Sequence, residues 1–173
     1  MELKIYPDDV LRRECEPLRE VGPEERRRLK RMVDFMYECE GVGLAGPQVG
    51  WEARVVALDV EQDGEDPRIF LNPRLLESEG NEVDSEGCLS FPGIVAPVPR
   101  AERVKISAYT LEGDRIEREV EGLHARAWQH EVDHLNGVLL IDHLPTAELL
   151  KIRRSLKKLE SRSNSAHAVR TGR

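Results

Sequence analysis

The sequence of 173 residues is short of cysteine and of long hydrophobic runs. Its three cysteines, Cys15, Cys39 and Cys88, are odd in number and widely spaced, unlike a disulfide framework, so we expect a reducing compartment. No apolar run approaches the roughly 20 residues that span a bilayer. The first residues contain neither an apolar signal segment nor a basic transit segment. These absences predict a cytoplasmic protein without a membrane contact.

The chain also has no excess of positive charge. Its net charge of −7 argues against a general DNA-binding or RNA-binding surface. Hydrophobic residues make up 39% and charged residues 34%, which fits a globular protein with a heavily charged surface. The length predicts a single domain, which we place over residues 1–160, with residues 161–173 as a polar, flexible tail.

Hydrophobic spacing predicts three helices. The first covers residues 23–38, has apolar side chains at helical intervals and begins at Pro23, and its basic residues should form a solvated face. The second covers residues 123–136 and stops at Gly137. The third covers about residues 147–162, capped by Thr146. Its apolar face consists of Leu149, Ile152, Leu156 and Leu159.

Between these helices the pattern changes to short strands. Residues 54–60 and 69–71 read as strands, residues 75–76 as a further short one, and residues 103–110 with 115–121 as a hairpin. Because strands and helices are segregated along the chain, we expect an α+β fold. In it, antiparallel or mixed sheets pack around the second helix, flanked by an N-terminal and a C-terminal helix.

Two histidines have the spacing of a metal-binding pair. His130 and His134 are four residues apart, so on a helix both imidazoles project from one face. Glu131 between them could take a proton from a water molecule at such a site. Because the pattern also arises by chance on amphipathic helices, a third ligand is needed.

The third ligand has more than one candidate. A third histidine of the metzincin type would fall at residue 140, which is Leu140. A downstream glutamate is not excluded by spacing, and Glu148 is the nearest. Cys88, in the segment 86–90, offers a thiolate, which binds soft or borderline divalent metals. Taken alone, Cys88 could equally be a small buried hydrophobic residue.

Residues 41–50 form a glycine-rich stretch, expected as a loop. Residues 41–46 match the dinucleotide-binding fingerprint literally, but that fingerprint follows a strand and opens a helix, whereas here a helix precedes it and Pro47 follows closely. Glycines allow close approach of another backbone. The loop could therefore border an extended peptide, with the amide of Gln48 donating to a developing oxyanion. A plain turn is the alternative.

Three stretches, residues 41–50, 86–90 and 129–137, together resemble the three motifs of peptide deformylases, in the same order. The resemblance extends to about residue 160, and it departs at Gly46, where the family usually has alanine. It implies a hydrolase that removes the formyl group from the N-formylmethionine of newly made polypeptides and releases formate. It also implies one divalent metal ion bound by Cys88, His130 and His134. Fe²⁺ is implied first, with Zn²⁺, Ni²⁺ or Co²⁺ as substitutes.

The same resemblance implies roles around the metal ion. Glu131 becomes the residue that moves the proton, while the Gln48 amide and the backbone N–H of Leu89 stabilise the oxyanion. Glu86 and Arg100 match an ion pair beside the cysteine ligand.

The substrate needs an apolar pocket and a backbone partner. We expect the methionine side chain to lie against Val42, Leu89 and Leu123, and the peptide backbone to pair with the edge at Val42 and Gly43. Asp133 could orient a ligand or simply be solvated.

The final helix is basic on one side. A solvated face is the simpler interpretation, and docking on the ribosome is the one that the family prompts. The residues concerned are Lys151, Arg153, Arg154, Lys157 and Lys158.

Two rival functions stay open on the sequence alone. One is a zinc peptidase, and the other is a structural or regulatory metal-binding protein whose site is closed by a fourth side chain. No second cysteine lies near Cys88, which favours an open catalytic position.

Overall fold

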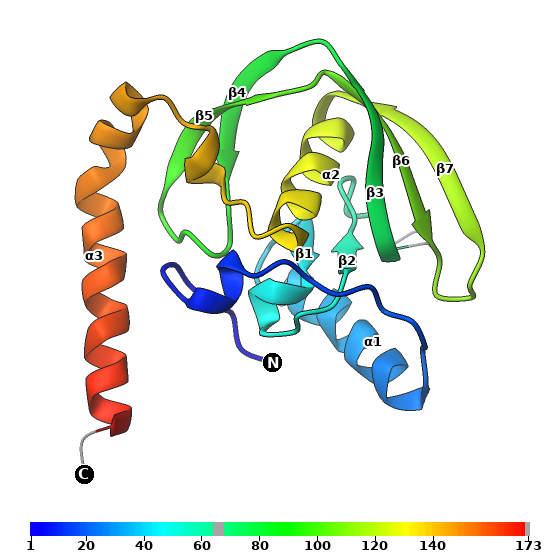
Figure 1. Ribbon diagram of the computed structural model, residues 1–173, viewed down its shortest axis with the longest axis horizontal. Helices are drawn as coiled ribbons and strands as arrows, with labels where there is room; N and C mark the ends of the chain where they lie inside the picture. The colour runs from blue at the N-terminus through cyan, green and yellow to red at the C-terminus, as the bar shows by residue number, and fades with distance from the viewer. Residues whose placement is uncertain (64–67, 172–173) are drawn as a thin grey trace.

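The computed structural model describes residues 1–63 and 68–171, with side chains described as far as residue 162, and it has an α+β architecture (Figure 1). The helices of the described residues are α1 (Pro23–Glu38), α2 (Gly122–Leu135) and α3 (Thr146–Thr171), with short 3₁₀ helices η1 (Asp9–Arg12), η2 (Gly46–Val49) and η3 (Leu140–His143). The strands are β1 (Gly43–Ala45), β2 (Val55–Leu58), β3 (Ile69–Glu79), β4 (Glu82–Gly87), β5 (Val95–Arg100), β6 (Arg103–Tyr109) and β7 (Arg115–Glu121). The predicted helices and hairpin are all present.

The strands form two antiparallel sheets. The larger has the order β1-β2-β3-β6-β7, and the smaller consists of β4 and β5 alone. In Figure 1, α2 stands between the small sheet and strands β3, β6 and β7. Trp128 of α2 packs edge-on against Phe70 of β3, with ring centroids 4.7 Å apart. The predicted arrangement of sheets around this helix is confirmed.

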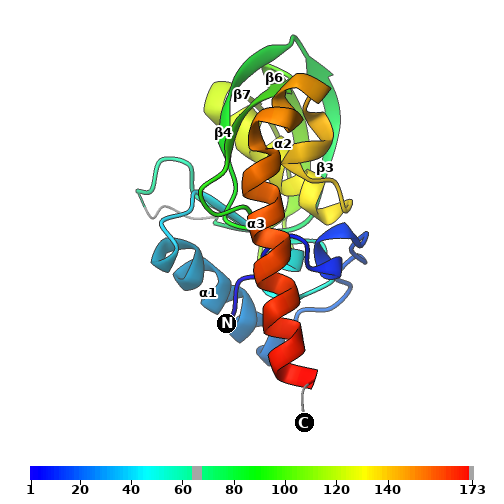
Figure 2. The same ribbon diagram turned by 90° about the vertical axis from the view of Figure 1, so that its left-hand side faces the viewer.

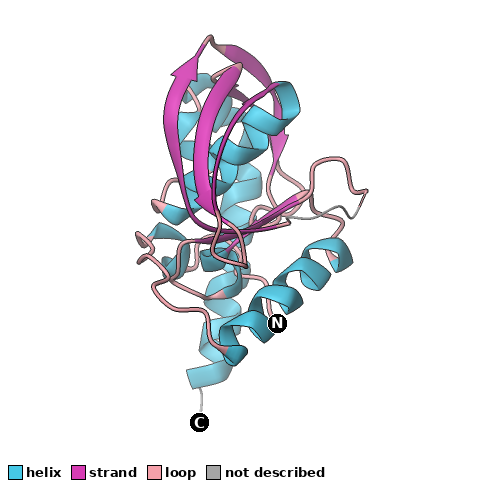
Figure 3. Ribbon diagram, turned by 90° about the vertical axis from the view of Figure 1, so that its right-hand side faces the viewer, coloured by secondary structure: helices cyan, strands magenta, loops and turns pink. Residues whose placement is uncertain are grey.

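Helices α1 and α2 cover opposite faces of the first three strands. The register aligns Leu44, Ala57 and Ile69, and all three belong to the apolar cluster under α1. Because successive side chains of a strand point to opposite faces, the next aligned row faces α2. That row consists of Ala45, Val56 and Phe70. Seen from the side in Figure 3, α1 lies at the lower end of the molecule, below the long strands.

Helix α3 runs along the outside of the molecule (Figure 2). Its predicted apolar face joins the third cluster, together with residues of β5 such as Ala96 and Val98. The hydroxyl of Tyr6 donates to Glu160 at 3.2 Å. The helix continues to Thr171, so the boundary expected near residue 162 lies inside it. No helix among the described residues combines the length and the hydropathy that crossing a bilayer requires.

Two local interpretations of the sequence were wrong, and one pair of strands was missed. Residues 69–71 and 75–76 are parts of the single strand β3, which passes Pro73 because the register with β6 shifts between Leu71 and Arg74. Asn72 has a positive φ of 50° there, and its side chain bonds the backbone N–H and C=O of Leu18 at 2.8 and 2.9 Å. The stretch 41–50 is not a loop but contains β1 and η2. Strands β4 and β5 were not assigned from sequence.

Candidate metal centre

The structure brings Cys88, His130 and His134 together. Their donor atoms lie within 4.8 Å of one another. The Sγ of Cys88 is 3.3 Å from Nε2 of His134, which is 3.2 Å from Nε2 of His130. Among the residues that the structure describes, this is the one group of three or more histidine, cysteine or carboxylate side chains placed to share a metal ion.

Two elements of different type supply these side chains. Helix α2 carries both histidines on one face, one turn apart, and it ends where Gly137 takes a φ of 70°. A Cβ at Gly137 would lie 2.5 Å from the carbonyl oxygen of Arg12, so the chain must be glycine there. Cys88 directly follows β4, in a turn closed by the Phe91 N–H donating to the Cys88 C=O at 2.9 Å.

The predicted ion pair of Glu86 and Arg100 is present and holds His130 in place. Nδ1 of His130 lies 2.5 Å from Oε1 of Glu86, which directs Nε2 towards Cys88 and His134. Arg100 donates to both oxygens of Glu86, at 2.7 and 3.1 Å. Burial alone would raise the pKa of Glu86, but the hydrogen bonds from His130 and Arg100 outweigh it and hold that pKa well below its usual range.

Sequence reasoning missed Arg126 as part of this network. Its guanidinium donates to Oε2 of Glu86 at 3.1 Å and to the carbonyl oxygens of Val98 and Glu82 at 2.9 and 3.2 Å. Arg126 lies four residues before His130, hence on the same face of α2. That spacing, on a helix expected to be buried, is the signal that could have identified it.

Asp133 and His143 extend the network on the other side. Nε2 of His143 lies 2.7 Å from Oδ2 of Asp133, and Arg100 also donates to Asp133. Arg100 therefore joins a carboxylate of β4 to one of α2. Of the two interpretations of Asp133, simple solvation does not fit, because only 19% of its side chain is exposed; its partners among the described residues are Arg100 and His143 and not one of the three donors.

Glu131 is buried next to β1 with its carboxylate beside Gly43. It is 4% exposed, and its Oε2 has no hydrogen-bond partner among the described residues. Burial raises the pKa of Glu131 to about 7. A Cβ at Gly43 would lie 2.3 Å from Oε1 of Glu131, so an alanine there would displace the carboxylate from its present position.

The side chain of Gln48 is fixed in one orientation. Its Oε1 accepts from the Ala45 N–H at 2.8 Å, so Nε2 faces Ser90 Oγ at 3.3 Å and Cys88 Sγ at 3.6 Å. Gln48 is 1% exposed. An amide donor therefore points towards the cluster.

The glycine-rich stretch is more closely packed than a turn. At Gly46, a Cβ would lie 2.5 Å from the carbonyl oxygen of Ala53 and 2.6 Å from that of Trp51. An alanine there would therefore require a backbone shift. At Gly41, a Cβ would lie 2.9 Å from the side chain of Leu89. Leu89 thus packs against the first glycine of the stretch.

The other predicted residues lie at the periphery. Val42 accepts the Asp59 N–H at 2.9 Å through its carbonyl oxygen, next to the edge strand β1. Leu123 lies in the first turn of α2, is 60% exposed, and lies seven residues before His130, which is about 10 Å along the helix. Glu148, the alternative third ligand, lies at the start of α3 and contacts Lys151 at 2.6 Å.

The donor set fits a divalent metal ion. A thiol and two imidazoles suit soft or borderline metals, and three protein ligands leave a position open. The pKa of the His134 imidazole is lowered by burial and then by the neighbouring His130. Its Nε2 faces the other two donors, while Glu86 fixes the ring of His130.

Comparisons with known proteins point to one family. The family model described as polypeptide deformylase matches residues 1–149. A peptide deformylase of Alkalilimnicola ehrlichii is 40% identical, covering 100% of this chain and 98% of that protein. One of Thermotoga neapolitana is 42% identical, covering 89% and 93%.

Solved structures give the same result. A peptide deformylase from Plasmodium falciparum is 36% identical with a TM-score of 0.91, covering 96% of this chain and 99% of that one. Peptide deformylase 1B from Arabidopsis thaliana, in complex with an inhibitor, is 35% identical with a TM-score of 0.90, covering 100% and 95%.

Proposed function

Because the chain belongs to the polypeptide deformylase family and removes the N-formyl group from newly made polypeptides, we propose that Cys88, His130 and His134 hold the metal ion of this reaction. The observation that carries the proposal is the convergence of these three donors within 4.8 Å, beside the buried carboxylate of Glu131. A metal ion bound there supplies Lewis acidity, which lowers the pKa of water to about 7.

We propose Fe²⁺ as the metal ion, with Zn²⁺, Ni²⁺ or Co²⁺ able to replace it. Thiolate and imidazole donors accept all four, since ligand type alone does not select among neighbouring first-row metals. Availability and oxidation then decide which ion is present.

Glu131 moves the proton in this proposal. Its carboxylate accepts a proton from the attacking water and returns it to the nitrogen as the C–N bond breaks. The products are formate and a free amino terminus. Two features support the role: the carboxylate is buried beside the metal ligands, and one of its oxygens is left without a partner among the described residues.

Gln48 and the backbone N–H of Leu89 are proposed to stabilise the oxyanion of the tetrahedral intermediate. The fixed orientation of Gln48 supports this, because a donor that is already aligned needs no reorganisation during the reaction. Leu89 follows Cys88 directly in the same turn.

The peptide substrate is proposed to extend the large sheet. β1 lies at the edge of that sheet and is paired only with β2, which leaves the other edge for an added strand at Val42 and Gly43. The exposed side chain of Leu123 offers apolar surface for the methionine side chain.

Transient contact with the ribosome, and a cytoplasmic location, complete the proposal. The three cysteines are unpaired, which supports a reducing compartment.

The exposed basic side of α3 supports contact with RNA, although a solvated face has the same composition. Glutamine at all five basic positions should abolish salt-sensitive ribosome binding; unchanged binding would favour the solvated face. The positions are Lys151, Arg153, Arg154, Lys157 and Lys158.

The decisive experiment is anaerobic purification followed by metal analysis and measurement of formate released from a formyl-Met peptide. Glu131→Gln should keep the metal ion and lose about 10²- to 10⁴-fold in rate. Retained turnover would contradict the role of Glu131. An enzyme that cleaved unformylated peptides and released no formate would instead be the zinc peptidase.

A further inference from the structure

A groove on the α1 face of the sheet takes no part in the chemistry above. It has a volume of about 750 Å³ and is formed by α1, the start of β3 and the turn between β6 and β7. Because α1 and α2 cover opposite faces of the sheet, the groove and the metal centre are separated by the strands. The volume falls within the roughly 300–1,000 Å³ of small-molecule sites.

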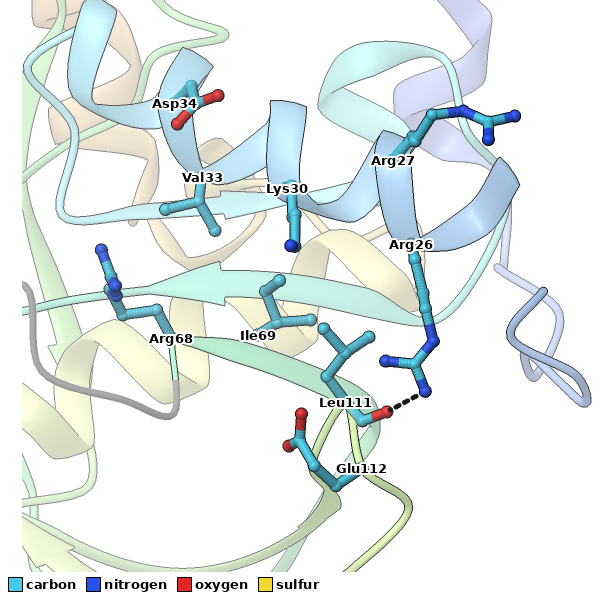
Figure 4. A pocket seen from close by; sticks show the side chains of 9 residues that line it. All are labelled: Arg26, Arg27, Lys30, Val33, Asp34, Arg68, Ile69, Leu111 and Glu112. Atoms are coloured by element: carbon cyan, nitrogen blue, oxygen red, sulfur yellow. Dashed lines mark hydrogen bonds between the residues drawn. The ribbon is translucent and has the colours of Figure 1, made fainter. Parts of the chain in front are cut away.

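Cationic side chains converge on this groove. Figure 4 shows Lys30 extending from α1 into the space above Ile69, with Arg26 and Arg68 at its two ends. Arg26 donates to the carbonyl oxygen of Leu111 at 3.2 Å, which ties α1 to the β6–β7 turn. One carboxylate, that of Glu112, lies at the lower side, while Asp34 and Arg27 project from the outer part of α1.

The other basic residues of α1 are used differently. Arg28 stacks over the ring of Trp51 at 4.3 Å, and Arg31 pairs with Glu38 at 2.6 Å. Lys30, by contrast, makes no ion pair within 4 Å among the described residues. The predicted solvated face of the first helix is therefore divided, and part of it lines a concave site.

The groove also has an apolar wall. Val33 and Ile69 are 8% and 9% exposed at its base, and Leu111 closes it from the turn. An inorganic anion would contact the cations but leave Leu111 and the small exposed parts of Val33 and Ile69 in contact with water. A neutral apolar molecule would leave Lys30 without a counter-ion. A ligand with an anionic group and an apolar body would contact both the cations and the apolar wall.

The charge of the whole chain restricts the size of that ligand. At a net charge of −7, an extended polyanion would leave the cationic groove and meet negative surface. Within about 8–10 Å, at physiological salt, the local cations dominate the field instead. This argues for a small anion and against nucleic acid.

We propose that this groove binds a small amphipathic anion, an organic phosphate or carboxylate with an apolar body. The anionic group lies beside Lys30 and Arg26, and the apolar body lies against Val33, Ile69 and Leu111. The site is additional to deformylation and does not depend on the assignment of the metal ligands.

The test uses the zinc-loaded full-length enzyme titrated with 1-naphthyl phosphate, 1-naphthoate, 1-naphthol and inorganic phosphate. Calorimetry gives the affinity, and amide ¹H–¹⁵N shifts locate the site. At least one of the two naphthyl anions should bind with a Kd of about 1 mM or tighter, and 1-naphthol and inorganic phosphate more weakly. Shifts should appear in α1 and the β6–β7 turn, and the affinity should fall as salt rises.

Substitutions at the exposed Lys30 and Glu112 and at the partly buried Leu111 separate the contributions. Lys30→Gln should weaken the binding of the naphthyl anion by about fivefold. The control Lys157→Gln, which removes one positive charge from α3, should leave this affinity unchanged. Glu112→Gln should tighten binding, because a like charge leaves the site. Leu111→Ala should weaken the binding of the naphthyl anion but leave the affinity for inorganic phosphate unchanged.

Several outcomes would overturn the proposal. They are no binding of either naphthyl anion, equal affinity in the wild type and Lys30→Gln, and shifts confined to α2 and residues 86–90. The last would show that the anion binds at the metal centre. Equal binding of 1-naphthol and the anions would reduce the groove to an apolar patch.

Discussion

The metal centre and the α1 groove use the same kinds of charged side chain in opposite ways. At the metal centre, Glu86 and Arg100 are 7% and 5% exposed, and each has more than one partner. In the groove, Lys30 and Glu112 are exposed, and cations lie near one another. Buried charges with partners fix the geometry of a ring or a carboxylate. Exposed charges in a concave surface give a field that a mobile ligand can use.

The strongest way to break this contrast is to remove a buried partner. Glu86→Gln leaves Arg100 and Arg126 buried without their shared carboxylate, so the free energy of unfolding should fall by about 3–5 kcal/mol. Urea denaturation at fixed metal concentration measures it. The control is Glu77→Gln, because Glu77 is an exposed partner of Lys105 at 3.5 Å and should cost less than about 1 kcal/mol. Equal effects of the two substitutions would contradict the contrast.

The next effect comes from crowding Glu131. Gly43→Ala places a Cβ where the carboxylate now lies, so the rate of formate release should fall by about 10²-fold while the metal ion stays bound. If the effect acts through Glu131, adding Gly43→Ala to Glu131→Gln should cost little more. Additive losses would show that Gly43 acts in another way, for example through the substrate strand.

Cys15 shows the effect of burial on a pKa where no neighbouring positive charge outweighs that effect. Burial raises the pKa of the Cys15 thiol from 9.0 to about 11. Above pH 9 the unfolded chain releases a proton that the folded chain retains, so stability should fall as the pH rises from 9 to 11. The loss should be about 2 kcal/mol. Cys15→Ala should remove this part of the slope in denaturation curves; an unchanged slope would assign it to other groups.

The smallest effect is expected in the groove. The pair of substitutions Arg27→Gln and Lys30→Gln should change the free energy of unfolding by less than about 0.5 kcal/mol, since both side chains are exposed and neither forms a described ion pair. Thermal denaturation at low and high salt measures it. A loss as large as that of Glu86→Gln would show that these cations support the fold.

Local patterns in the sequence were enough for the helices, the hairpin and the histidine pair. The spacing of His130 and His134, and the glycine at residue 137, depend only on neighbouring residues, and both are confirmed as features of α2. The resemblance of the three motifs to one family also indicated that Cys88 lies beside the histidines. In the structure, the turn after β4 and helix α2 bring these residues together although they are far apart in sequence.

What the sequence did not reveal depends on pairing across long distances. β5 contains Pro97 and Pro99, and proline argues against a strand. Both prolines are tolerated because β5 pairs with β4 alone and has one free edge. β3 continues past Pro73 only because a register shift accommodates it. The contacts of Arg126 and the groove beside Lys30 form only when strands distant in sequence pack against α2 and α1, so neither could be predicted from local patterns.

The convergence of Cys88 and His134, 46 residues apart, has a consequence for how the protein assembles. Neither the β4 turn nor α2 alone carries the full donor set, so if these residues hold the proposed ion, an unfolded chain would bind it more weakly than the folded one. By mass action, an ion held there joins the small sheet to the central helix and resists their separation. The free ion concentration would then set the resistance of the enzyme to heat, and a chelator would lower its melting temperature.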